Sequence, residues 1–116
     1  MSDSRRWLRL CDLNDLEDGS MKRISVDGHP NIAVYCVNGE YFATADTCTH
    51  ATASLSDGGW LDGHTVICPA HSGEFDIRTG AALCFPVETP LATYPTEIRD
   101  QTVWAAVEVT NSSSNE

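Results

Sequence analysis

The sequence predicts an all-β domain of short antiparallel strands, folded as a sandwich or a barrel. No stretch of the 116 residues shows a sustained helical period of apolar positions with caps at its ends. Short runs rich in β-branched and aromatic residues alternate instead with turn sequences. The clearest signal is Asn38-Gly39 between residues 32–37 and 41–44. A type I′ hairpin turn needs positive φ at both central residues, and Asn-Gly supplies it.

The first half of the chain predicts four strands. Residues 7–13 form the first strand, which ends in a charged turn at 15–19. Residues 22–26 form the second and end at Asp27-Gly28-His29-Pro30, where glycine and proline favour a turn. The Asn-Gly hairpin then supplies the third and fourth.

The second half predicts shorter strands between turns and loops. Turns are expected at 57–59 and 62–64, followed by a strand at 65–68. A hairpin is expected from 74–77 to 81–85 across Arg78-Thr79-Gly80, and a last one around Arg99-Asp100-Gln101. The polar tail at 111–116 is expected to be disordered.

Composition narrows the possible functions. The chain has a hydrophobic fraction of 41% and a net charge of −10, which fits one globular domain and argues against nucleic acid as a partner. An acidic surface suits either steering towards basic patches on proteins or solubility alone. No apolar run approaches the roughly 18 residues of a membrane helix, and no signal peptide is evident. An odd number of cysteines, five, argues against a secreted disulfide scaffold and favours the cytoplasm.

Two short segments each combine a thiol and an imidazole. Cys48-Thr49-His50 and Cys68-Pro69-Ala70-His71 are separated by the seventeen residues 51–67. Thiolates suit zinc or iron–sulfur centres, and imidazole suits zinc or iron. The segments therefore predict a metal centre held by Cys48, His50, Cys68 and His71.

The ligand spacing favours two neighbouring irons over one zinc ion. Structural zinc sites usually separate paired ligands by roughly two to five residues, whereas only Thr49 separates Cys48 from His50. One intervening residue in an extended loop directs two side chains apart. A two-iron centre with cysteines on one iron and histidines on the other satisfies this geometry, while zinc stays open as an alternative.

Further short motifs accompany these segments, namely Leu55-Ser56-Asp57-Gly58, Leu61-Asp62-Gly63, Gly73-Glu74-Phe75-Asp76, Thr79-Gly80 and Pro86. Together they resemble the Rieske family, and in particular the soluble Rieske ferredoxins that supply electrons to bacterial aromatic-ring dioxygenases. The resemblance covers residues 7–109. It implies an antiparallel Rieske-type β-sandwich over residues 1–110, with a small cluster-binding subdomain inserted at about 45–86. It also implies one [2Fe-2S] cluster per chain, with Cys48 and Cys68 on one iron and His50 and His71 on the other.

The resemblance implies an electron carrier and not an enzyme. Such a ferredoxin passes single electrons from a flavin-dependent ferredoxin reductase to a terminal oxygenase, and we expect a cytoplasmic monomer. A docking surface is expected at the cluster tip, where Thr52, Ser72 and Pro86 would surround the edges of His50 and His71.

The sequence further predicts a low reduction potential. High-potential Rieske proteins join their ligand loops by a disulfide, but Ala53 and Ala70 occupy the matching positions. Those proteins also direct a serine and a tyrosine hydroxyl at cluster sulfurs, where this chain has Gly73 and Phe75. Fewer hydrogen bonds to sulfur disfavour the added electron, so we expect a midpoint near about −150 mV and not about +300 mV.

Two other functions compete with the ferredoxin. The chain could be the Rieske small subunit of another oxidoreductase such as nitrite reductase, although the four ligands argue against the small subunits that lack a cluster. A zinc domain for protein interaction is the third possibility, and it would be colourless.

The remaining candidate residues are expected to be structural. His29 and His64 lie in turn sequences and are expected to be exposed. Cys11 and Cys36 lie in strands and are expected to be buried, while Cys84 has no ligand role in the family pattern. Core or packing roles are expected for the three tryptophans, Trp7, Trp60 and Trp104.

Overall fold

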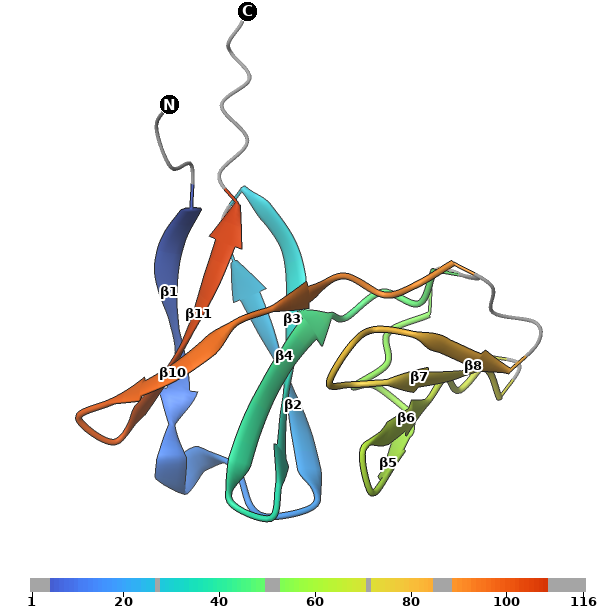
Figure 1. Cartoon of the computed structure of the whole chain (residues 1–116), viewed down its shortest axis with the longest axis horizontal. Coiled ribbons are helices and arrows are strands. Elements are labelled where there is room, and N and C mark those ends of the chain that lie inside the picture. Colours follow the sequence, from blue (N-terminus) through green and yellow to red (C-terminus); the bar gives the residue numbers. More distant parts are fainter. Residues whose placement is uncertain (1–4, 27, 50–52, 71, 85–88, 109–116) are drawn as a thin grey trace, which may run out of the picture.

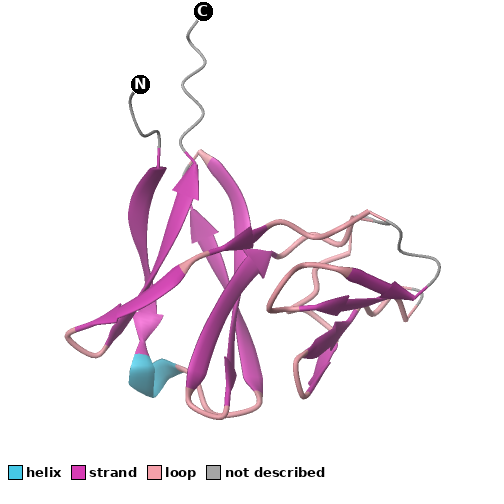
Figure 2. Ribbon diagram, viewed as in Figure 1, coloured by secondary structure: helices cyan, strands magenta, loops and turns pink. Residues whose placement is uncertain are grey.

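The computed structural model describes residues 5–26, 28–49, 53–70, 72–84 and 89–108, and these confirm the all-β prediction. Three antiparallel sheets are present, with strand orders β1-β11-β10, β2-β3-β4-β9 and β5-β6-β7-β8 (Figures 1 and 2). The strands are β1 Arg5–Asp12, β2 Ser20–Val26, β3 His29–Val37, β4 Glu40–Ala45, β5 Trp60–Asp62, β6 Thr65–Ile67, β7 Glu74–Asp76, β8 Ala82–Cys84, β9 Thr93–Tyr94, β10 Thr96–Arg99 and β11 Thr102–Glu108. One 3₁₀ turn, η1 (Leu13–Asp15), joins β1 to β2.

From Ile32 to Val37, strand β3 is buried on both faces. Ile32, Val34 and Cys36 pack with β1 and β11 in the sandwich core, whereas Ala33, Tyr35 and Val37 pack with the third sheet and its loops. Successive residues of a strand point to opposite faces, so β3 reads as an unbroken apolar run and separates two cores. Figure 1 shows the sheet containing β3 lying between β1-β11-β10 and β5-β6-β7-β8.

The predicted Asn-Gly hairpin is confirmed. Asn38 and Gly39 have φ angles of 54° and 82° and connect β3 to β4. A second two-residue hairpin joins β10 to β11 at Asp100 and Gln101, with φ angles of 50° and 64°. This turn adopts the left-handed conformation without a glycine, which side chains disfavour.

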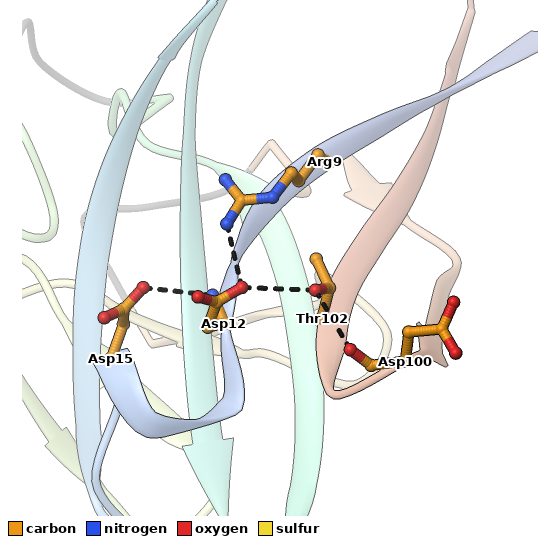
Figure 3. Close-up of polar contacts among 5 residues, drawn as sticks. All are labelled: Arg9, Asp12, Asp15, Asp100 and Thr102. Carbon is orange, nitrogen blue, oxygen red and sulfur yellow. Dashed lines mark hydrogen bonds and ion pairs between the residues drawn. The ribbon is translucent and has the colours of Figure 1, made fainter.

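Hydrogen bonds to the end of β1 hold the glycine-free turn. The Leu13 N–H donates to the Gln101 carbonyl at 2.9 Å, and the Thr102 hydroxyl donates to the Asp12 carboxylate at 3.1 Å. Figure 3 shows this carboxylate between Arg9 and Thr102. These bonds offset the backbone cost of the turn and tie it to the β1 end.

Two strands were absent from the sequence prediction, β5 and β9. They have only three and two residues, too few to show an alternating pattern. β9 pairs with β4 through Ala43–Tyr94 and Thr44–Thr93. The C-terminal part of the chain thereby returns to the edge of the central sheet before β10 and β11 pair with each other and with β1.

The third sheet is formed by four strands consecutive in sequence, all within the predicted insertion at 45–86. It stands to one side of the sandwich (Figure 1). The boundaries of that insertion stay a prediction, and the tail at 111–116 lies outside the described residues. No helix in the described part of the chain is long and apolar enough to cross a membrane.

Because Tyr35 is buried, the stability of the fold is predicted to fall at alkaline pH. Its hydroxyl is 2.8 Å from the Thr44 hydroxyl, and both residues are fully buried. Burial raises the pKa of Tyr35, the bond to Thr44 partly offsets this, and the charge of Asp46 raises the pKa further. Because the folded-state pKa is raised, the stability contribution is complete below about pH 10 and declines at higher pH, as the unfolded phenol ionises.

We therefore expect Tyr35→Phe to lose less stability than the parent between about pH 10 and pH 12. Urea unfolding at several pH values measures this. The Thr44 hydroxyl keeps a hydrogen-bond partner in the variant because it also donates to the Ala45 carbonyl at 2.8 Å. Parallel pH profiles for the two proteins would contradict the prediction.

Candidate metal centre

The fold brings the two predicted cysteine ligands into one buried core. Cys48 follows β4 and is 3% exposed, while Cys68 directly follows β6 and is 1% exposed. Both belong to the apolar cluster that contains Tyr35, Leu55 and Phe75. The two predicted histidine ligands, His50 and His71, lie outside the described residues.

Backbone hydrogen bonds close the first ligand loop on itself. The Cys48 N–H donates to the Ala53 carbonyl at 3.0 Å, and Thr47 and Ser54 form an antiparallel bridge. The Leu55 N–H donates to the Asp46 carbonyl at 2.8 Å. Cys48 is therefore fixed by a short antiparallel ladder at the base of its loop.

The second ligand loop is a tight turn around Cys68. The Cys68 N–H donates to the Gly73 carbonyl at 2.7 Å, and the Ser72 N–H donates to the Cys68 carbonyl at 3.1 Å. The Ala70 N–H points at the Cys68 sulfur, with a donor–acceptor distance of 3.4 Å. An amide donor stabilises negative charge on a thiolate or on a cluster.

Gly59 lets the two loops approach each other closely. A Cβ atom at this position would lie 2.3 Å from the Leu55 carbonyl oxygen and 2.6 Å from that of Ile67. One oxygen belongs to the first loop and the other to the strand that leads into Cys68. The neighbouring Gly58 lies against Pro69 of the second loop.

Asp46 is a functional candidate that sequence reasoning missed. It is 1% exposed, and its carboxylate accepts hydrogen bonds from the Ser54 hydroxyl at 2.5 Å, the Ser56 hydroxyl at 2.6 Å and the Ser56 N–H at 3.0 Å. The available signal was an acidic residue two positions before the first ligand motif, followed by two serines after it. Only the fold shows that these groups meet.

Several expectations about other residues need correction. His29 and His64 are half-buried, not exposed, and pack against Tyr94 and Phe42 with ring-centroid separations of 5.7 and 5.5 Å. Trp7 and Trp60 are 38% and 52% exposed, so they are not core residues. The Arg99 guanidinium lies 5.0 Å from the Trp7 ring centre and 5.5 Å from that of Trp104.

Of the other cysteines, two lie in the sandwich core and the third lies beside the second ligand loop. Cys11 and Cys36 are buried in the sandwich core, as predicted, and burial raises the pKa of the Cys11 thiol. Cys84 is partly exposed, and its thiol is directed at the Ser72 carbonyl at 3.8 Å. Within the described ranges no group of three or more Cys, His, Asp or Glu side chains could hold a metal ion.

The residues present fit an iron–sulfur cofactor. Two thiols from different loops lie in one apolar core, and one sulfur receives an amide hydrogen bond. A family model described as the Rieske [2Fe-2S] domain matches residues 6–95. The chain belongs to the Rieske family. Its cofactor is therefore a [2Fe-2S] cluster, and the zinc alternative is wrong.

Rieske ferredoxins are among the proteins similar to this one. It is 44% identical over 98 residues to the ferredoxin component of a p-cumate 2,3-dioxygenase system from Pseudomonas putida, covering 84% of this chain and 83% of that protein. It is 39% identical over 102 residues to ferredoxin CarAc from Metapseudomonas resinovorans, covering 88% and 94%.

Solved structures of ferredoxins have the same fold as this Rieske protein. A ferredoxin from Sphingomonas yanoikuyae B1 superposes with a TM-score of 0.81 at 42% identity, covering 90% of this chain and all of that one. A chain from a complex of reduced oxygenase and oxidized ferredoxin in carbazole 1,9a-dioxygenase gives a TM-score of 0.84 at 38% identity, covering 91% and 97%.

Proposed function

We propose that this Rieske protein takes single electrons from a flavin-dependent ferredoxin reductase and passes them to the terminal oxygenase of an aromatic-ring-hydroxylating system. The observation that supports this most directly is the near full-length similarity to the ferredoxin components of dioxygenase systems. The chain is itself an electron carrier and not the catalyst. Its action as a cytoplasmic monomer is part of the proposal.

Four side chains would hold the cluster in this proposal. Cys48 and Cys68 bind one iron, and His50 and His71 bind the other. The burial of both cysteines in one core supports the first pair. The bound cluster would supply a one-electron redox centre, while the apolar core around Cys48 and Cys68 would exclude water from their thiolates.

The residues at positions 73 and 75 favour a low potential. Phe75 is fully buried, and Gly73 has no side chain; its carbonyl accepts a hydrogen bond from the Cys68 N–H. Neither residue carries a hydroxyl that could stabilise the reduced cluster. This supports a midpoint near about −150 mV, which suits electron transfer between a flavin and an oxygenase.

The charge of the cluster-bearing region suits a basic partner surface. Residues 45–86 contain the five carboxylates of Asp46, Asp57, Asp62, Glu74 and Asp76 against the single guanidinium of Arg78. That guanidinium pairs with Asp76 at 3.0 Å, and the hydrogen bonds from Arg78 hold the pKa of Asp76 below its usual range. Of the five carboxylates, those of Asp57 and Asp62 are exposed. Exposed acidic groups accelerate encounter with basic surfaces, and high salt removes this effect.

The proposal is tested by electron transfer between purified components. The dithionite-reduced protein is mixed anaerobically with an oxygenase of this class, and oxidation of the ferredoxin is followed by stopped-flow absorbance. We expect rapid oxidation whose second-order rate constant falls by about tenfold or more between about 20 and 300 mM salt.

A redox titration with electron paramagnetic resonance provides the companion measurement. The expected result is a mixed cysteine–histidine signal with a midpoint near about −150 mV. Failure of every ring-hydroxylating oxygenase tested to oxidise the protein would contradict the oxygenase partner. The nitrite reductase alternative rests on a small subunit from Mycobacterium tuberculosis that is 18% identical with a TM-score of 0.76, a likeness that shows the fold alone.

A further inference from the structure

We propose that Asp46 places a buried negative charge beside the cluster and thereby lowers its reduction potential. Asp46 is two residues before Cys48, so their Cα atoms lie within about 7 Å of each other. Its backbone N–H donates to the Asn31 carbonyl at 3.0 Å, and its carbonyl accepts from Leu55. The residue is thus fixed at the base of the first ligand loop.

Hydrogen-bond donors surround the buried carboxylate of Asp46. Both Oδ atoms accept hydrogen bonds, one from Ser54 and the other from the hydroxyl and N–H of Ser56. All three partners act as donors. An ionised carboxylate is an acceptor only, with room for several donors on its two oxygens.

No cation neutralises this charge within the described part of the chain. The ion pairs there are Arg9–Asp12, Arg78–Asp76 and Arg99–Glu97, all at exposed or partly exposed positions. Hydroxyl and amide dipoles stabilise the Asp46 carboxylate without removing its net charge. The field of a unit charge therefore extends into the surrounding core.

The charge of Asp46 acts on the core that holds the cysteines. It contributes to raising the pKa of Tyr35, a fully buried residue of the same apolar cluster as Cys48 and Cys68. Charges act more strongly through such an interior than through water, and salt screens them less. Reduction adds a negative charge to the cluster, so a fixed negative charge nearby disfavours reduction.

The inference rests on the proposed ligation by Cys48 and Cys68. Its test compares the midpoint potentials of Asp46→Asn and Asp57→Asn with that of the parent, each in its cluster-loaded form. Both substitutions remove one carboxylate from the same segment, but Asp57 is exposed. Asparagine keeps the shape of aspartate and an oxygen that can accept from Ser56.

We expect Asp46→Asn to raise the midpoint and Asp57→Asn to raise it by less than half as much. The Asp46→Asn shift should persist between about 50 and 500 mM salt, whereas the Asp57→Asn shift should shrink, because water and salt screen only the exposed charge. A midpoint for Asp46→Asn that is unchanged, lowered, or shifted no more than in Asp57→Asn would overturn the proposal.

A second variant separates charge from loop support and covers the case in which Asp46→Asn does not load the cluster. Ser54→Ala combined with Ser56→Ala retains the carboxylate and removes two hydroxyl donors that counter its field. We expect a lower midpoint in this variant, opposite in direction to Asp46→Asn. An unchanged or raised midpoint overturns the electrostatic role, whereas absence of a Rieske signal in the parent protein would instead contradict the proposed ligation.

Discussion

Cys68→Ala is expected to yield a colourless protein without iron or a Rieske resonance signal. In the proposed ligation this substitution removes one of two cysteine ligands on the same iron, and the neighbours of Cys68 in its core are apolar among the described residues. Phe75, Val66 and Leu55 share this core and are fully buried. Iron analysis, visible absorption and electron paramagnetic resonance of the purified protein measure the result.

Cys36→Ala is the matched control for this experiment. Cys36 is 3% exposed, similarly to Cys68, but it belongs to the sandwich core on the opposite face of β3. The same truncation there should retain one cluster per chain and the parent spectrum. Loss of the cluster in both variants, or its retention in Cys68→Ala, would show that Cys68 is not a specific ligand.

Gly80→Ala is expected to destabilise the protein by about 3–5 kcal/mol, a large fraction of the about 5–15 kcal/mol typical of a domain. Gly80 lies in the turn between β7 and β8 with φ at 83°, and an added Cβ would lie 2.0 Å from the Leu91 carbonyl oxygen. The Leu91 N–H also donates to the Gly80 carbonyl at 2.7 Å. The clash would therefore push the turn between β7 and β8 away from the segment that contains Leu91.

Gly19→Ala is the matched control for the clash. Gly19 has φ at 82°, but an added Cβ would meet nothing within 4 Å. The Gly19→Ala variant should lose only about 1–2 kcal/mol of unfolding free energy. This is the cost of placing a side chain in the left-handed region. Urea unfolding of both variants measures the difference, and equal losses would indicate that backbone conformation alone determines the cost.

The sequence was sufficient where local chemistry determines structure. Asn38-Gly39 specified its hairpin because two positive φ angles are required there. It was insufficient where structure depends on distant partners. Asp100 and Gln101 form an equivalent turn without glycine because the β1 end supports it, and β9 exists because β4 offers an edge.

The candidate metal centre could likewise be predicted only in part from the sequence. Cys48 and Cys68 could be named from motif spacing, and the fold buries both in one core. Their role as ligands stays a prediction, and His50 and His71 lie outside the described residues. Asp46 could not be named, because its importance depends on Ser54 and Ser56 folding back onto it. His64 lies in a turn as predicted, but its ring is half-buried because Phe42 packs against it.

The double burial of β3 restricts how this chain can change in length. Ala33 and Tyr35 pack in the core that contains Cys48 and Cys68, while Ile32 and Val34 pack in the sandwich core. Inserting or deleting one residue within the strand would exchange these two sets, because a one-residue slip turns every side chain to the other face. A two-residue change would preserve which core each side chain enters. Among related proteins, length differences within this strand should therefore come in even numbers, while odd ones are confined to the loops.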